Sequence, residues 1–344
     1  MAKLSVSQIL DSFSSSAEKT WRRRFSKLTC FSTLFLIFMG GLVTSTGSGL
    51  SVPDWPLSYG TLFPPMVGGI VYEHSHRMVA SIVGLFMFIL CIWLARNETR
   101  RWVKILGFVA LGAVIAQGIL GGITVLFFLP KPVSILHGIL AQTFFVLTIV
   151  IAYSQSVERN IRQQFAHEAT VSDVCKLSFT VSALVYVQLI LGALMRHTGS
   201  GLAIPDFPTF AGEYLPSFDA ATLNAINFWR FDHNLPSVTM AQVFIHFLHR
   251  LGALFIVLAT GLLTFKSFKL SRERKSVLGS IFILNMIILV QLMLGAVTIW
   301  SEKAPYIASL HVVTGAAVLG MSVLLTLRSY PLKIGELKNL FSKV

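Results

Sequence analysis

Long apolar stretches recur along the chain, separated by shorter polar segments that carry most of the charges. Eight of these stretches are about 20 residues long, the length that an α-helix needs to cross a hydrocarbon layer about 30 Å thick. They cover residues 28–46, 73–95, 105–129, 133–153, 177–197, 239–265, 277–300 and 306–327. The pattern predicts an all-α polytopic membrane protein with eight transmembrane helices.

The charge distribution sets the expected orientation of these helices. Of the 344 residues, 54% are hydrophobic and 12% are charged, a composition suited to lipid. The basic residues that give the net charge of +13 gather in alternate polar segments: 1–27, 96–104, 154–176, 266–275 and 328–344. By the positive-inside rule, these segments and both termini are cytoplasmic. The charge is therefore a topology signal, and no nucleic-acid partner is expected.

The N-terminal arm favours a bacterial cell membrane as the location of this multi-pass protein. The N-terminal arm is short and contains the acidic residues Asp11 and Glu18. Transit peptides that direct proteins to mitochondria are poor in acidic residues. A mitochondrial inner membrane is therefore the less favoured location.

The chain also contains an internal repeat. Residues 46–56 read TGSGLSVPDWP and residues 198–208 read TGSGLAIPDFP, so eight of eleven positions are identical. Two shorter echoes pair residues that lie 173 or 174 positions apart: His76-Arg77 with His249-Arg250, and Gln117 and His137 with Gln291 and His311. Because both copies begin on the same side, they predict two pseudo-symmetric four-helix bundles related by an axis along the membrane normal.

The repeat divides the sequence into five expected parts. These are a cytoplasmic N-terminal arm (1–27), an N-terminal four-helix half (28–153), a cytoplasmic linker (154–176), a C-terminal four-helix half (177–327) and a cytoplasmic tail (328–344). The second half has about 21 extra residues in the outer segment 198–237. That insertion is expected to lengthen a loop without disturbing the helices.

Histidines are the main candidates for chemistry. Each half has one near the start of its second helix and one near the start of its fourth: His76 with His137, and His249 with His311. All four helices begin on the outer side, so the imidazoles are expected in one layer near that face. Two neighbouring helices can present imidazoles to opposite faces of a haem. The repeat therefore predicts paired haem ligands.

Other interpretations of the histidines stay open. Any single one could merely hydrogen-bond a neighbouring helix. A divalent-metal site would require carboxylates or thiolates nearby, and Glu73 is the one candidate. No CxxC or CxxCH motif occurs, which argues against zinc and against covalently attached haem. Four histidines at equivalent positions favour a cofactor, because polar groups in lipid are costly and usually functional.

Glu73 distinguishes the first half from the second. It precedes His76 by three residues and so shares its helix face, whereas the equivalent residue in the second half is His246. Glu73 is expected to act as an acid or base beside a bound ligand. The alternative is a helix N-terminal residue that the helix dipole favours.

Two arginines and the repeated loops complete the expected site. Arg77 and Arg250 directly follow ligand histidines and could bind haem propionates, or could serve as snorkelling anchors. Gly, Pro and the residues Asp54 and Asp206 in the repeated loops favour tight turns. The loops are expected to form a structural lid over the histidine layer.

Taken together, these segments resemble a known family. GGLVTSTGSGLSVPDWP, EHSHR, LHG, TGSGLAIPDFP, HFLHR and LHVVTG, spread over residues 40–320, are similar to the haem A synthases. The resemblance implies an enzyme that oxidises the C8 methyl group of haem O to a formyl group by successive hydroxylations, giving haem A. It implies haem B as the cofactor in the C-terminal half and haem O as the substrate in the N-terminal half.

The resemblance also implies roles for individual residues. His249 and His311 would be the axial ligands of haem B, with Arg250 beside them. His76 and His137 would hold haem O, and Glu73 would serve its oxidation. Beyond haem O and membrane lipid, the expected partners are a haem O synthase and an electron donor. The oxidant, the donor and homo-oligomer formation stay open.

One feature departs from the family. Some members carry a cysteine pair in the first outer loop, but residues 47–72 contain no cysteine. A thiol relay proposed for those members therefore does not apply here.

Two other classes of protein compete with this interpretation. A b-type cytochrome with bis-histidine haems would only transfer electrons, and it would usually stack its haems across the bilayer. A secondary transporter would be expected to show broken helices and paired ionisable groups near the midplane. The single layer of histidines and the unmatched Glu73 weigh against the cytochrome. The sequence shows no sign of the broken helices and paired ionisable groups that a transporter would need.

Overall fold

The computed structural model describes residues 6–164, 173–268 and 275–329. These ranges hold ten α-helices and one short 3₁₀ helix. The helices are α1 (Val6–Ser45), α2 (Ile70–Asn97), α3 (Arg101–Leu126), α4 (Lys131–Ser154), α5 (Val157–Gln164), α6 (Asp173–His197), α7 (Ala220–Asp232), α8 (Met240–Ser267), α9 (Lys275–Trp300) and α10 (Pro305–Ser329), with the 3₁₀ helix η1 at Ser200–Leu202.

Eight of the described helices are long and apolar enough to cross a membrane, which confirms the predicted number and order of the spans. Many large apolar side chains on them are exposed, among them Phe31 on α1 and Phe282 on α9. Such an apolar surface suits contact with lipid rather than water. The molecule is therefore a polytopic, all-helical membrane protein.

Helix α1 extends well beyond its predicted span. The apolar pattern predicted a helix from residue 28, but the helix begins at Val6 and continues without a break to Ser45. Gly40 is the first glycine in this helix, and no proline interrupts it. The arm contains neither glycine nor proline, so it can continue the helix beyond the apolar stretch.

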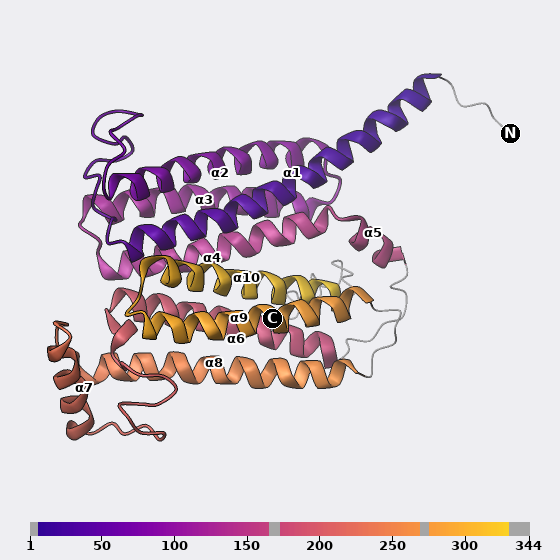
Figure 1. Ribbon diagram of the computed structural model, residues 1–344. Coiled ribbons are helices and arrows are strands. Elements are labelled where there is room, and N and C mark those ends of the chain that lie inside the picture. The colour runs from indigo at the N-terminus through magenta and orange to yellow at the C-terminus, as the bar shows by residue number, and fades with distance from the viewer. Residues whose placement is uncertain (1–5, 165–172, 269–274, 330–344) are drawn as a thin grey trace, which may run out of the picture.

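The helices form two groups of four that lie side by side. Helices α1–α4 make one group, and α6, α8, α9 and α10 make the other (Figure 1). The groups meet where α1 and α4 pack against α10, and where α4 packs against α6. A Cβ at Gly320 on α10 would lie 3.0 Å from the Phe145 ring of α4, so the glycine permits this close approach. The symmetry between the groups stays a prediction.

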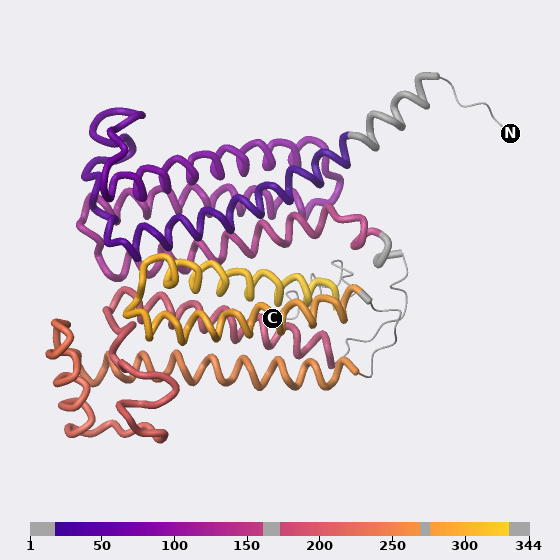
Figure 2. Tube along the Cα trace, viewed as in Figure 1, coloured from indigo at the N-terminus to yellow at the C-terminus, as the bar shows by residue number. Residues whose placement is uncertain are grey.

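The long loops gather at one end of the molecule. Figure 2 shows the segments 46–69 and 198–239 at the end opposite to α5, which lies in the basic linker. The loop-bearing end is called the outer end below. The insertion in the second loop contains helix α7, with the Asp219 side chain accepting a hydrogen bond from the Thr222 backbone at its start. The extra residues thus add a capped helix, where the sequence predicted only a longer loop.

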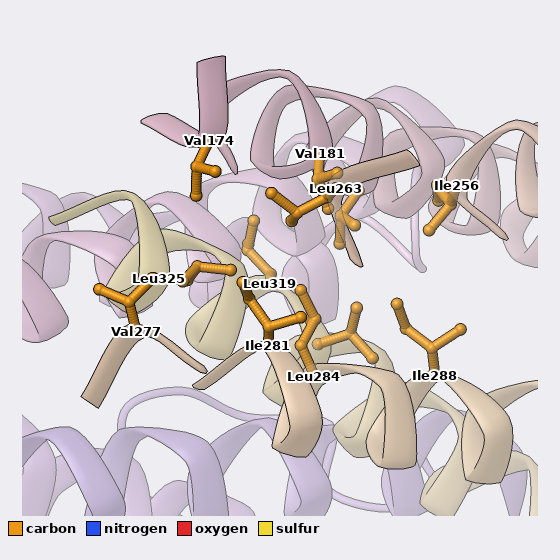
Figure 3. Packing of buried hydrophobic residues seen from close by; sticks show 12 residues of the cluster. Val174, Val181, Ile256, Leu263, Val277, Ile281, Leu284, Ile288, Leu319 and Leu325 are labelled. Carbon is orange, nitrogen blue, oxygen red and sulfur yellow. The ribbon is translucent and has the colours of Figure 1, made fainter. Parts of the chain in front are cut away.

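Apolar packing fills each group toward the basic end. The largest buried cluster joins α6, α8, α9 and α10, as Figure 3 shows with Val181, Leu263, Leu284 and Leu319 at its centre. A second cluster, which includes Val83, Leu90 and Phe144, joins α2, α3 and α4. Because lipid tails are as apolar as leucine, these contacts stabilise the bundle through close packing.

The four candidate histidines lie closer to the outer end than these apolar clusters do. His76, His137 and His311 each follow the start of their helix by six residues, and His249 follows by nine. At about 1.5 Å per residue, all four lie roughly 9–14 Å below their helix starts. The predicted single layer near the outer end is consistent with these positions.

Candidate functional site

Each of the four histidine rings packs against a glycine of the preceding membrane helix. The pairs are His76 with Gly40, His137 with Gly121, His249 with Gly192, and His311 with Gly295. A Cβ on these glycines would lie 3.1, 3.6, 3.3 and 3.2 Å, in that order, from the Cε1 atom of the ring. The glycines therefore let each imidazole lie directly on the neighbouring backbone. The sequence analysis did not identify them, although their positions recur in the repeat.

His249 and His311 face one another across α8 and α10. Their ring centroids are 6.5 Å apart and the ring planes differ by 67°. An ion held at about 2 Å by one nitrogen of each imidazole separates those nitrogens by about 4 Å and the ring centres by a little over 6 Å. The spacing of this pair thus fits two imidazoles that would hold one iron between them.

His76 and His137 occupy the corresponding helix positions in the first group, each against its own glycine, and their pairing stays a prediction. In His76, His137 and His311 the Nδ1 atom is buried and has no hydrogen-bond partner. Each of these three residues is partly exposed, and coordination through Nε2 stays a prediction.

The donor set fits haem better than a bare metal ion. Within the described ranges, no group of three or more His, Cys, Asp or Glu side chains could hold an ion. Structural and catalytic zinc sites take three or four protein ligands. A porphyrin supplies four nitrogens itself, so a pair of imidazoles completes the coordination of its iron. Paired histidines without a third protein ligand are therefore what haem requires.

Glu73 anchors the first outer loop to α2. Its Oε2 accepts a hydrogen bond of 2.8 Å from the Val52 backbone N–H, and its Oε1 accepts one of 2.6 Å from Arg77. The side chain is buried. Glu73 is thus a buried carboxylate, paired with an arginine, one helical turn from His76.

His246 makes the equivalent contacts in the second group. Its Nδ1 accepts a hydrogen bond of 3.2 Å from the Ile204 backbone N–H, and its Nε2 lies 3.3 Å from Nε of Arg250. The halves therefore share the hydrogen-bond pattern and differ in the charge that the buried residue carries.

The arginines after the ligand histidines bind loop carbonyl groups. Arg77 donates to the carbonyl oxygens of Val52, Asp54 and Leu57. Arg250 donates in the same way to the carbonyl oxygens of Ile204, Asp206 and Thr209. Both guanidinium groups thus hold the loops against the helices. Contact with propionates stays a prediction.

The predicted turns in the repeated loops are confirmed. The Asp54 carboxylate accepts hydrogen bonds from the backbone N–H groups of Tyr59 and Gly60, and the bond from Gly60 contributes most to lowering its pKa. Asp206 accepts the equivalent bonds from Ala211 and Gly212. Each loop also has one cis peptide bond, Trp55-Pro56 or Phe207-Pro208. The loops are closed by their own hydrogen bonds, as a rigid lid requires.

Three further polar residues of the membrane helices contact a neighbouring element. Gln117 on α3 donates to the His137 carbonyl on α4 at 2.9 Å, a hydrogen bond between two membrane helices. The amide nitrogen of Gln291 on α9 lies 3.4 Å from Nε2 of His311 on α10. His74 on α2 contacts the Ser58 hydroxyl of the first outer loop at 2.9 Å.

Arg196 connects the two groups near the histidine layer. Its guanidinium donates to the Gly41 carbonyl at 3.0 Å and to the Ser45 hydroxyl, both on α1. Ser309 on α10, two residues before His311, donates to the same hydroxyl at 3.0 Å. The sequence analysis missed this link, because a lone arginine at a helix end resembles an ordinary interfacial anchor.

Comparison with known proteins finds one matching family model and several similar proteins that share one name. A family model described as "Cytochrome oxidase assembly protein" matches residues 23–68 and 69–323. A "Heme A synthase" of Alkalihalophilus pseudofirmus is 32% identical over 199 residues, which are 56% of this chain and 65% of that protein. The match thus spans less than two thirds of that relative.

Two further relatives match over most of their length. A "Heme A synthase" of Bacillus pumilus is 28% identical over 84% of this chain and 89% of its own. One of Geobacillus kaustophilus is 25% identical over 91% of this chain and 94% of its own. The likeness therefore extends across both groups of helices.

Proposed function

Because this chain belongs to the haem A synthase family of cytochrome oxidase assembly proteins, we propose that it makes haem A by oxidising the C8 methyl group of haem O. The observation that carries the proposal is the pair formed by His249 and His311, with ring centroids 6.5 Å apart. Such a pair suits a bound redox haem. The second pair, His76 and His137, suits the substrate. Within the described spans, Glu73 is the only buried glutamate that adjoins a predicted ligand histidine, and it lies beside this pair.

The two pairs take different roles in this proposal. His249 and His311 would be the axial ligands of haem B, which supplies one-electron redox chemistry when bound. His76 and His137 would hold haem O, so that binding to a rigid pair of helices orients the macrocycle. Arg250, and Arg77 in the other half, are the candidates for contact with propionates.

The reaction consists of two successive hydroxylations of one carbon. Each step replaces one C–H bond of the methyl carbon with a C–OH bond, so the carbon gives up two electrons to an external oxidant and takes its hydroxyl oxygen from that oxidant or from water. The first step gives an alcohol and the second a geminal diol. Loss of water from the diol leaves the formyl group. The carboxylate of Glu73, one turn from His76, would accept a proton or stabilise positive charge that develops on the carbon. Burial strengthens either effect, because the local dielectric constant is low.

The expected setting follows from the topology. The chain would lie in a cell membrane with both termini in the cytoplasm, receive haem O from a haem O synthase, and receive electrons from a separate donor. The histidine layer would then lie near the outer face.

The proposal is tested by analysing the pigments of the purified protein. The chain is produced in cells that make haem O, and the extracted haems are identified by mass. Haem B together with haem O and its alcohol or formyl derivatives is expected. Haem B alone, in the presence of available haem O, would instead indicate a b-type cytochrome that only transfers electrons.

A further inference from the structure

Gln188 is the polar side chain that adjoins His249. It lies on α6, and its amide nitrogen is 2.7 Å from the His249 carbonyl oxygen and 3.1 Å from Nδ1 of the same residue. The amide oxygen is buried and has no hydrogen-bond partner. One amide thus contacts both the backbone and the ring of a predicted haem ligand.

The space for this amide comes from a glycine. A Cβ at Gly252, one helical turn after His249, would overlap the Oε1 atom of Gln188. Any other residue at this position would displace the amide from the ring. Gln188 and Gly252 therefore form a matched pair across α6 and α8.

The internal repeat provides a natural comparison. Gly192 and Gly40 pack against His249 and His76, which aligns α6 with α1 and places Leu36 at the position of Gln188. The same alignment of α8 with α2 places Val79 at the position of Gly252. Leu36 and Val79 both pack against the apolar cluster of the first group. One half thus has an amide and a cavity for it where the other has two apolar side chains.

The chemistry of an iron-bound imidazole gives this difference a consequence. When Nε2 binds iron, the proton of a neutral imidazole is on Nδ1. The partner of that Nδ1–H fixes the ring orientation and raises the basicity of the ligand. In the structure the amide nitrogen of Gln188, a donor, faces Nδ1 and binds the His249 carbonyl. To accept the Nδ1–H of an iron-bound ring, the amide would rotate about its bond to this carbonyl until the unpartnered Oε1 faces Nδ1. A more basic ligand stabilises the oxidised iron.

We propose that Gln188, in the space left by Gly252, is a positioning residue that orients His249 and lowers the reduction potential of the haem held by His249 and His311. The inference rests on the proposed function. It gives the two haem sites different redox properties: an amide adjoins His249 in the C-terminal site, and Leu36 and Val79 take the equivalent positions in the N-terminal site.

The test uses the full-length protein with its bound haem. The midpoint potential of the low-spin haem is measured by spectroelectrochemical titration for wild type, Gln188→Leu and the double variant Gln188→Leu/Gly252→Val. The double variant reproduces the pair Leu36 and Val79, so it removes the polar contact while filling the space. Asn285→Leu, which removes an amide that bonds α8 within the same half but touches no histidine, is the matched control.

Both leucine variants should shift the potential upward, by about a fivefold change in the ratio of reduced to oxidised haem at a fixed ambient potential. Gln188→Glu, which keeps an acceptor for Nδ1–H, should leave the potential at or below the wild-type value, and Asn285→Leu should leave it unchanged. An unshifted potential in the leucine variants, or its return to the wild-type value in the double variant, would overturn the inference.

The outcomes separate this inference from the proposed function. A wild-type protein without low-spin haem would contradict both. A wild-type protein with low-spin haem, together with unshifted leucine variants, would contradict only the role of Gln188.

Discussion

Glu73 and His246 occupy equivalent positions in the two halves, and each accepts a hydrogen bond from the backbone of the outer loop above it. Each also contacts the arginine four residues further along its helix. The contacts are alike, so the difference between the halves is the carboxylate. If the two sites have separate roles, they must differ chemically. The carboxylate beside one predicted histidine pair supplies such a difference.

Replacing Glu73 by glutamine should stop the oxidation without loss of bound haem. The amide oxygen of glutamine can still accept the Val52 N–H, so the loop stays anchored, but the charge is lost. We expect the reduced spectrum of the C-terminal haem to be unchanged and conversion of haem O to fall by about 100-fold or more. The ratio of haem O to haem A in pigment extracts measures this effect.

The variant Asp54→Ala tests whether Glu73→Gln acts through the lost charge or through a disturbed outer loop. This variant loosens the turn at Tyr59 and Gly60 but leaves the Glu73 carboxylate in place. A smaller loss of conversion than in Glu73→Gln is expected. An equal loss in the two variants, or loss of bound haem in Glu73→Gln, would argue against a chemical role for the carboxylate.

Alanine at the glycines that contact histidines should reduce haem binding. In an exposed helix interior, Gly→Ala stabilises by up to about 1 kcal/mol. At Gly192 and Gly295, however, the new Cβ would lie 3.3 and 3.2 Å from the ring of His249 or His311 and would push it aside. We expect both variants to lower the haem content per mole of purified protein, measured by absorbance.

Two glycines in the same group of helices serve as controls. A Cβ at Gly261 or Gly279 would meet no atom within 4 Å. Gly261→Ala and Gly279→Ala should therefore keep full haem content and equal or higher thermal stability. If Gly192→Ala also kept full haem content, close contact between glycine and imidazole would be irrelevant to ligand placement.

The fold was predictable because a membrane constrains the sequence strongly: its spans must be apolar, and the segments on the cytoplasmic side are basic. Spans of apolar residues and alternate basic segments gave the eight helices, and the repeat gave the four histidines and their pairing. Contacts that depend on the third dimension were not predictable. Gln188 and Gly252 lie 64 positions apart, and neither stands out until α6 is packed against α8. The start of α1 and the helix in the second loop were missed because apolar periodicity does not report on polar helices.

A cluster of charges at the basic end should make stability depend on acidic pH. Glu98 is buried, which raises its pKa, but hydrogen bonds from Arg100 and Gln155 outweigh burial and lower the pKa to about 2 from 4.5. Arg22 of α1 lies 3.8 Å from the same carboxylate. A depressed folded-state pKa stabilises the protein above the unfolded pKa, and this contribution is lost as the pH falls from about 4.5 toward 2.

Glu98→Gln tests this linkage. At pH 7 the variant should be less stable than wild type by up to about 3 kcal/mol, because it forfeits the charged interactions that depress the pKa. The difference in apparent melting temperature between the two proteins in detergent should shrink as the pH is lowered from 6 to 3. A difference that stays constant over this range would show that the carboxylate charge does not stabilise the basic end.

The most direct measurement of the central claim is the reduced absorption spectrum of purified single-histidine variants. We predict that His249→Ala and His311→Ala each abolish the low-spin b-type spectrum, whereas His76→Ala and His137→Ala retain it and lose the substrate haem. Retention of that spectrum in both His249→Ala and His311→Ala would contradict the account, because the two imidazoles would then not be the ligands of the bound haem.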